Sequence, residues 1–189
     1  MRKEVSLDKA TRLINHGPVI LVSSLCGERL DITPVAWHMP VSKKPPIIVL
    51  EIDEGHFIYE CIMNTGDFAV NIPSFALLEK VVAIGSCSGR DVDKFKEMGF
   101  LREDSRKIRS PRIKEAMAVM ECVLIKDDYL LDKYNMVMGE VKHAEASEDA
   151  FDDHWLIRDD GTRTVHHLGD RIFCVPDGRV MDLRKKENM

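Results

Sequence analysis

The first 52 residues show a pattern of hydrophobic and polar positions that predicts one helix and then three strands. Four apolar residues recur at helical spacing, and Ser6, just before them, is of a type that commonly caps helix N-termini. These apolar residues are Leu7, Ala10, Leu13 and Ile14. The glycine and proline at 17–18 end the helical pattern. Three extended segments follow it, at 18–25, 30–46 and 46–52.

The middle of the chain alternates again between helix and strand. Residues 56–65 place apolar side chains on one helical face and are followed by Gly66, so they predict a helix that ends there. The stretch "DFAVNIP" at 67–73 returns as a strand. Two shorter helices are predicted next, the first capped by Ser74 and the second by Asp91.

The second half of the chain has mainly the pattern of strands. A charged, poorly periodic segment at about 101–115 precedes two long predicted strands, 116–127 and 134–146. A hairpin that turns at Gly169-Asp170 follows. About six or seven strands, mostly without helical crossovers, predict a mainly β fold with attached helices, built as an antiparallel barrel. A doubly wound parallel sheet fits less well, because strict alternation of strand and helix is lost after residue 100.

Composition places the chain among ordinary globular proteins. Its 189 residues are 44% hydrophobic and 31% charged, which predicts a single domain over 1–189 with a flexible C-terminal tail at 176–189. The formal net charge of -5 gives no reason to expect a nucleic-acid partner. No apolar run has the length of a membrane span and the N-terminus lacks the apolar core of a signal peptide, so we expect a cytoplasmic protein without a membrane partner.

Motifs and cysteines exclude several kinds of site. The chain has no G-x-G-x-x-G, P-loop, G-x-S-x-G or H-E-x-x-H, which mark common nucleotide-binding and hydrolase sites. His166 and His167 are adjacent in a predicted strand and face opposite ways, so we expect no metal site there. Five scattered cysteines without a C-x-x-C pair favour small buried residues over a disulfide framework or a zinc site. Cys87, in the loop-like "GSCSGRD", is the thiol most open to contact.

The stretch "LDITPVAWHMPVSKKPP" at 30–46 is the strongest candidate for a binding segment. Pro34 and Pro40 remove backbone donors, so this strand is predicted to be irregular or at the edge of a sheet. The backbone groups left unpaired there suit a planar, amide-rich ligand. On the residues alone, Trp37 is equally compatible with a role as an anchor at a dimer interface.

Several pieces in order give the chain a family resemblance. They are "GPVILVSS", "LDITPVAWHMPVSKKPPIIVLEI", "HFIYECIMNTGDFAVNIP" and "GSCSGRDVDKF". Over residues 10–145 the chain resembles the flavin reductase-like proteins, particularly the flavoredoxin-type branch. The resemblance implies an antiparallel, Greek-key-like FMN-binding split β-barrel, a homodimer with flavins near the subunit interface, and FMN as cofactor.

The resemblance also implies which residues meet the flavin. The segment "DITPVAW" and the residue after it would surround the ring and ribityl chain, and the start of the helix "HFIYECI" would face the phosphate, where free N–H groups favour an anion. Further donors would come from the loop at 88–94 and from the strand that begins "KYNMVMGEV". The implied site residues are Asp31, Thr33, Ala36, Trp37, His38, Ile58, Ser88, Arg90, Lys94 and Tyr134.

Four of these positions depart from the family pattern. Asp31 stands where asparagine is expected, Ala36 where serine is common, Ile58 where threonine or serine often meets the phosphate, and Tyr134 where histidine is frequent. Each change alters a hydrogen-bonding group, so we expect weaker FMN binding than is usual in the family. Without the resemblance, Ile58 has the spacing of a core residue and Lys94 that of a solvated one.

The function implied is that of an FMN-dependent oxidoreductase. It would pass reducing equivalents from a nicotinamide nucleotide (NADH or NADPH) or a protein donor to flavin, iron or a redox partner. Because the flavin carries out the hydride and electron chemistry, no catalytic acid or base is required of the chain. Two alternatives remain open: an FMN-carrying electron-transfer protein without its own turnover, and a cofactor-free barrel that serves as an interaction module.

Overall fold

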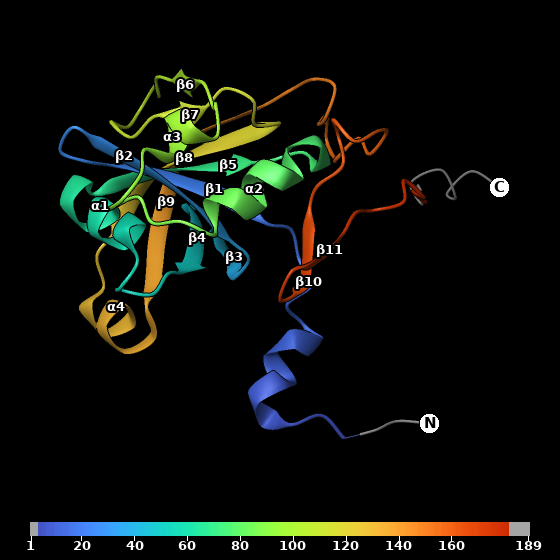
Figure 1. The fold of residues 1–189 in the computed structure, drawn as a ribbon, viewed down its shortest axis with the longest axis horizontal. Helices are drawn as coiled ribbons and strands as arrows, with labels where there is room; N and C mark the ends of the chain where they lie inside the picture. The colour runs from blue at the N-terminus through green and yellow to red at the C-terminus, as the bar shows by residue number, and fades with distance from the viewer. Residues whose placement is uncertain (1–3, 182–189) are drawn as a thin grey trace.

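A seven-stranded antiparallel sheet forms the centre of the protein (Figure 1). The computed structural model describes residues 4–181. The strands of the sheet are β1 (Ile20–Cys26), β2 (Arg29–Val35), β3 (His38–Lys43), β4 (Pro46–Glu51), β5 (Asp67–Ile72), β8 (Ala118–Ile125) and β9 (Met136–Ala146). Their spatial order is β2-β1-β5-β8-β9-β4-β3, and every neighbouring pair is antiparallel. The prediction of a mainly β, antiparallel fold with attached helices is confirmed.

The proline-rich stretch at 30–46 supplies both edges of this sheet. It forms two strands instead of one, because β2 ends at Val35 and β3 begins at His38. Pro34 lies in β2 opposite Leu21, and the register of β3 against β4 shifts after Pro40. An edge strand tolerates proline since its outer side needs no backbone N–H. The predicted edge position is therefore confirmed.

Residues 4–181 form six helical segments besides the strands. They are the 3₁₀-helices η1 (Leu7–Leu13) and η2 (Phe75–Leu77) and the α-helices α1 (Phe57–Thr65), α2 (Leu78–Ile84), α3 (Lys94–Glu97) and α4 (Asp128–Tyr134). The prediction for α1 is confirmed, and Gly66 ends this helix in the left-handed conformation with φ 75°. The sequence prediction missed α4 altogether. None of the helices between residues 4 and 181 has the length and apolar character needed to cross a membrane.

The predicted capping residues were mostly wrong. Ser6 and Ser74 precede η1 and η2, but neither side chain caps its helix. Asp93, instead of Asp91, caps α3 by accepting the Lys96 N–H at 3.1 Å. None of the residues of η1 is buried within the chain, and this helix projects away from the sheet (Figure 1).

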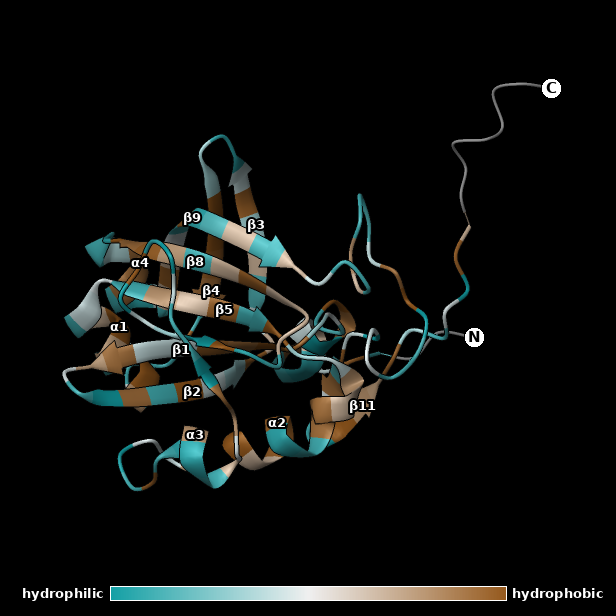
Figure 2. Cartoon of the chain, turned by 90° about the horizontal axis from the view of Figure 1, so that it is seen from above, coloured by the Kyte–Doolittle hydropathy of each residue, from teal (hydrophilic) through white to brown (hydrophobic). Residues whose placement is uncertain are grey.

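Strand β1 separates two hydrophobic cores because successive side chains of a strand point to opposite faces. Ile20 and Val22 face the core enclosed by the curved sheet and by α1. Leu21 faces a second core, formed with α2 and α3 on the other face. Figure 2 shows these two helices along the same side of β1 and β2. The connection from α2 to α3 is thereby held beside the end of β2.

Two short hairpins complete the described fold. One pairs β6 (Arg102–Glu103) with β7 (Arg112–Ile113), and the other pairs β10 (His166–Gly169) with β11 (Ile172–Cys174). The second confirms the predicted turn, in which Asp170 has a positive φ of 54°. The predicted tail at 176–189 lies partly outside the described residues, which end at 181, and nothing tests this prediction.

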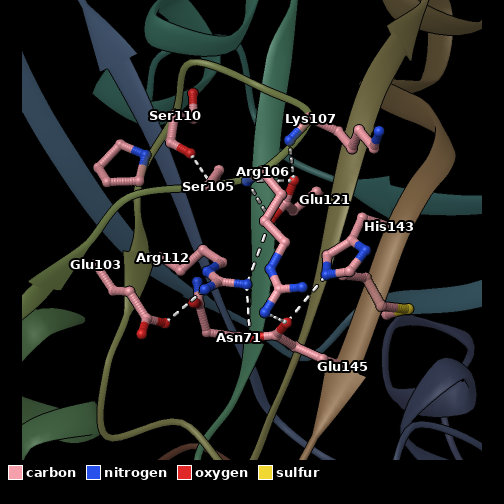
Figure 3. A network of polar contacts seen from close by, with 12 residues as sticks. Asn71, Glu103, Ser105, Arg106, Lys107, Ser110, Arg112, Glu121, His143 and Glu145 are labelled. Carbon is pink, nitrogen blue, oxygen red and sulfur yellow. Dashed lines mark hydrogen bonds and ion pairs between the residues drawn. The ribbon is translucent and has the colours of Figure 1, made fainter.

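A buried network of charges fixes the segment from β6 to β7, which the sequence predicted as a charged loop (Figure 3). Glu121 on β8 is fully buried and accepts the backbone N–H groups of residues 106 and 107 at 2.6–3.0 Å. The Arg112 guanidinium contacts Glu121 at 3.4 Å, Glu103 at 2.8 Å and Glu145 at 2.7 Å. The loop is therefore fastened to β8 and β9 through ionic contacts.

Candidate functional site

A cavity of about 610 Å³ opens where three segments of the chain meet. The first is the end of β2 with the two residues that follow it, and the second is the connection from β4 to α1. The third is the connection from α2 to α3. Cavities of this size commonly bind small molecules and cofactors. The three segments are far apart in sequence and are brought together by the sheet order and by the second core.

The end of β2 supplies an apolar wall of the cavity. Pro34, Ala36 and Trp37 line it, and the Trp37 side chain is 47% exposed. The carbonyl of Trp37 accepts the Glu51 N–H at 2.9 Å, which fixes this short link against the end of β4. A large aromatic ring that is half exposed at the edge of a cavity is well placed to contact a planar ligand.

Asp31 and Lys94 form a buried ion pair in the wall of the cavity. Their side chains are 1% and 3% exposed, and Lys94 Nζ lies 3.0 Å from Asp31 Oδ1. Lys94 Nζ also donates a hydrogen bond of 2.8 Å to the Ile32 carbonyl. The family resemblance assigns this lysine to a phosphate, but in this structure its charge is already partnered by Asp31.

The environment of Asp31 disfavours its ionised form. Burial raises the pKa of the Asp31 carboxyl above its ordinary value, although the neighbouring Lys94 acts in the opposite direction. Gly89 lies directly against this carboxyl, because a Cβ at that position would come within 2.2 Å of Asp31 Oδ1. Oδ1 is itself enclosed by the protein, with Lys94 Nζ as its charged neighbour. The Asp31 carboxyl therefore belongs to the cavity wall as one half of an ion pair.

Two arginines stand at one end of the cavity. Arg90 lines it and pairs with Glu60 at 3.1 Å, while Arg29 donates to the carbonyls of Gly89 and Arg90 at 2.6 and 2.7 Å. Both guanidinium groups lie over the Phe57 ring, at 4.9 Å for Arg29 and 5.3 Å for Arg90. These contacts hold the loop around Gly89 in place and concentrate positive charge at this end.

Helix α1 begins at the same end. Phe57 is its first residue, and His56 before it provides no side-chain cap, so the first N–H groups of the helix lack that partner. Ser88 lies across the cavity and accepts the Arg90 N–H at 3.1 Å. Free N–H groups, a hydroxyl and an arginine together suit an anionic group such as a phosphate.

Acidic and thiol groups occupy other parts of the wall. Burial raises the pKa of Glu51, and the nearby charge of Asp53 adds to this effect. Cys87 is half-buried, and its Sγ lies 3.6 Å from the Ala83 carbonyl oxygen, to which it donates. The expectation that the five cysteines are buried is confirmed for Cys61 and Cys122 alone, because Cys26 and Cys87 are only partly buried and Cys174 is exposed. No group of three metal-ligating side chains was found in the part of the chain that the structure describes.

Comparison with known proteins gives the family. Residues 12–166, most of the chain, match the family described as "Flavin reductase like domain". The chain belongs to this family. It is similar to protein YddH of Escherichia coli (strain K12), with 35% identity over 180 residues that cover 93% of this chain and 95% of YddH.

Solved structures of flavin reductase-like proteins share the fold. An FMN-binding domain of a flavin reductases-like enzyme from Shewanella baltica OS155 superimposes with a TM-score of 0.83 at 26% identity, over 94% of this chain and 95% of that one. Flavoredoxin of Desulfovibrio vulgaris (Miyazaki F) gives a TM-score of 0.81 at 21% identity, over 97% and 99% of the two chains. The predicted split β-barrel is confirmed, and so is the flavoredoxin-type resemblance.

The flavin reductase-like fold brings seven of the ten predicted site residues to the cavity. These are Asp31, Thr33, Ala36, Trp37, Ser88, Arg90 and Lys94. Residues whose importance was not evident from sequence join them, among them Glu51, Phe57 and Gly89. Phe57 belongs to the helix start that the resemblance pointed to, whereas nothing in the local pattern marks Glu51. Arg29 was also missed, since it acts through contacts with residues about 60 positions away.

The other three predicted residues do not line the cavity. Ile58 is fully buried in the core beneath α1, as its helical spacing alone suggests. His38 is on β3, where its Nε2 lies 2.8 Å from the Pro18 carbonyl oxygen, and burial lowers its pKa. Tyr134 is on α4 and 46% exposed. A contact between any of these three and a flavin stays a prediction.

The residues of the cavity fit an FMN molecule. Arg90, Ser88 and the start of α1 offer donors for a phosphate, and the apolar strip from Pro34 to Trp37 suits a flat ring. The loop at Gly89 packs directly against the Asp31 carboxyl in the wall of the cavity. The glycine at 89 is needed for the loop to approach so closely. The fit holds although Lys94 is engaged with Asp31.

Proposed function

We propose that this chain binds FMN in the 610 Å³ cavity and acts as an oxidoreductase, with a nicotinamide nucleotide or a protein as donor and flavin, iron or a redox partner as acceptor. The observation that carries the proposal is the cavity itself. It joins a cationic end, formed by Arg90, Ser88 and the start of α1, to an apolar wall ending at Trp37. The family and its FMN-binding structural neighbour from Shewanella baltica support the choice of FMN.

In this function the protein binds and orients the cofactor. Bound FMN supplies the hydride and electron chemistry. Arg90 and the N–H groups at the start of α1 would hold the phosphate, while Trp37 and Pro34 would cover apolar ring surface and exclude water from it. The buried Asp31–Lys94 ion pair lies in the wall, where the charge of each partner is balanced by the other.

The half-exposed Trp37 at the rim leaves one side of the cavity open to a donor or acceptor. None of these residues is required to transfer a proton for the reaction to proceed. This is why a site without an obvious acid–base pair is compatible with an oxidoreductase.

Flavin titration tests the cofactor assignment. Replacing Arg90 by glutamine removes a charge-assisted contact worth about 1.5–3 kcal/mol, so FMN affinity should fall roughly 10- to 150-fold. Riboflavin has no phosphate, and its affinity should not change. Arg102→Gln is the matched control, because Arg102 is an exposed arginine on β6 that does not line the cavity.

The purified protein with FMN is then mixed with NADH or NADPH, and cofactor oxidation is followed by absorbance. Oxidation that depends on added FMN supports the oxidoreductase. FMN binding without oxidation of either nucleotide identifies an electron carrier that needs a protein donor. If the protein binds neither FMN nor riboflavin, the proposal is refuted. The alternative that then remains is a cofactor-free barrel that serves as an interaction module.

We also propose that the chain forms a homodimer. Leu7, Leu13 and Ile14 on the projecting η1 helix are each more than 60% exposed, and an apolar helix face of this kind is normally covered. Light scattering should give a mass near twice the 21.5 kDa of the chain. A monomer at micromolar concentration would contradict the dimer. The cytoplasmic location stays a prediction.

A further inference from the structure

Two cysteines, Cys26 on β1 and Cys61 on α1, belong to elements that pack against each other (Figure 1). Cys26 is the last residue of β1, and its Sγ lies 3.5 Å from Asn64 Nδ2 and 3.9 Å from Glu60 Oε1. Both of these residues are on the turn of α1 that carries Cys61. The Cys26 sulfur therefore packs against the turn of α1 on which the Cys61 side chain is buried. The two cysteines are 35 positions apart in the sequence and have no C-x-x-C spacing, so the sequence gave no sign of this pair.

The two thiols differ in their access to solvent. Cys26 is partly exposed, whereas Cys61 is completely buried. Burial raises the pKa of the Cys61 thiol, and the neighbouring Cys26 adds to that effect. An oxidant in solution therefore reaches Cys26 first. Cys61 needs no access to solvent to react with it, because the Cys26 sulfur already lies against the turn of α1 that carries Cys61.

We propose that Cys26 and Cys61 are an oxidation site that closes to a disulfide when the protein meets hydrogen peroxide. In the first step the Cys26 sulfur attacks peroxide, the O–O bond breaks, and a sulfenic acid and one water are formed. In the second step the Cys61 sulfur attacks the Cys26 sulfur, the S–O bond breaks, and a second water leaves. Two thiols and one peroxide thus give one disulfide and two waters.

The oxidant has a source beside the pair if the proposed function holds. Reduced flavin that reacts with dioxygen yields hydrogen peroxide, and α1 connects the thiol pair to the cavity through Phe57. This source rests on the proposed function, whereas the reactivity of the pair does not. Because Cys61 is held protonated, we expect the second step to take minutes to hours, as for an uncatalysed disulfide.

The disulfide would join two elements that shape the cavity. Cys26 precedes the β1–β2 turn, and Arg29 on its far side holds the carbonyls of residues 89 and 90. Cys61 belongs to α1, whose first residues line the cavity. A cross-link between residues 26 and 61 removes conformational freedom from the unfolded chain. We expect the folding equilibrium constant to rise by about 30- to 900-fold.

The test uses the flavin-free protein and added peroxide, so that it is independent of flavin binding. After treatment, free thiols are blocked and the protein is digested without reductant and examined by mass spectrometry. We expect one cross-linked species, the Cys26 peptide joined to the Cys61 peptide with the loss of two hydrogen atoms. Dithiothreitol should abolish it, and urea unfolding of the oxidised protein should shift to higher urea concentration.

Two serine variants complete the test. Cys26→Ser must lose both the linked peptide and the shift, whereas Cys174→Ser, which removes an exposed thiol on β11, must keep both. The proposal is overturned if wild-type Cys26 is oxidised to sulfinic acid without linking to Cys61. It is also overturned if Cys26 instead links to another cysteine. Failure of FMN binding would refute the proposed function and leave this result standing.

Discussion

Replacing Lys94 by methionine is the most informative single change, because it separates a structural role from a role in binding phosphate. The variant keeps a long side chain but removes the cation that lies 3.0 Å from Asp31. Both partners are almost completely buried, so water does not replace the lost partner. Breaking such a pair commonly costs about 3–5 kcal/mol, mostly because one charge is left buried alone.

The pKa of Asp31 decides how this cost depends on pH. Burial raises the pKa of Asp31 above its ordinary value of 3.8, so the folded protein binds this proton more readily than the unfolded chain does. The stability linked to this group is therefore complete below pH 3.8 and is lost as pH rises through the folded-state pKa. Removing Lys94 raises this pKa further. The deficit of Lys94→Met should accordingly be largest at neutral pH and shrink in acid.

Urea unfolding of the flavin-free protein at neutral and at acid pH measures the effect. Lys96→Met is the matched control, since Lys96 is on the same short helix but exposed, and it should stay within about 0.5 kcal/mol of wild type. The double variant Asp31→Asn/Lys94→Met removes both charges and should recover most of the stability. A single variant as stable as wild type, or a double variant no better than the single, would refute the buried-pair argument.

Two further predictions concern a glycine that has no space for a side chain and an arginine that is the ionic partner of a buried glutamate. Gly89→Ala places a Cβ 2.2 Å from Asp31 Oδ1. We therefore expect the free energy of unfolding in urea to fall by about 1–3 kcal/mol, and FMN to bind more weakly in a flavin titration. Unchanged values would mean that the loop moves to accept the methyl group at no cost. Arg112→Met leaves the fully buried Glu121 without its guanidinium partner. We expect the free energy of unfolding to fall by about 3–5 kcal/mol and to be partly restored in Arg112→Met/Glu121→Gln. An unchanged thermal midpoint in the single variant would contradict this expectation.

Local patterns in the sequence were sufficient for most of the fold. Helix α1 and its end at Gly66, the long strands β8 and β9 and the turn at Gly169-Asp170 depend on residues close together in the chain. Helix α4 was missed because its seven residues are few and lie between two strong strand patterns. The caps failed since several polar residues precede each helix, and tertiary packing selects the one that is used, as with Asp93.

The site was predictable only in part, for a different reason. The family resemblance identified the segments that line the cavity, and seven of its ten residues lie there. It did not reveal that Lys94 is neutralised by Asp31, because the two residues are 63 positions apart and the departure at Asp31 creates the partner. Nor did it reveal the role of Gly89, which depends on how closely two chain segments approach. Such effects arise from contacts between distant segments.

The order of the sheet has a consequence for how the barrel closes. β2 and β3 are consecutive in the chain yet lie at opposite ends of the seven-strand order, and only Ala36 and Trp37 connect them. A connection of two residues cannot bridge a flat sheet of that width, so it forces the sheet to curl until its ends meet. The cavity opens beside this two-residue link, and Ala36 and Trp37 are among the residues that line it. A ligand bound there therefore contacts the two-residue link between the edge strands. Its binding free energy stabilises the curled, closed arrangement of the sheet relative to the unfolded chain.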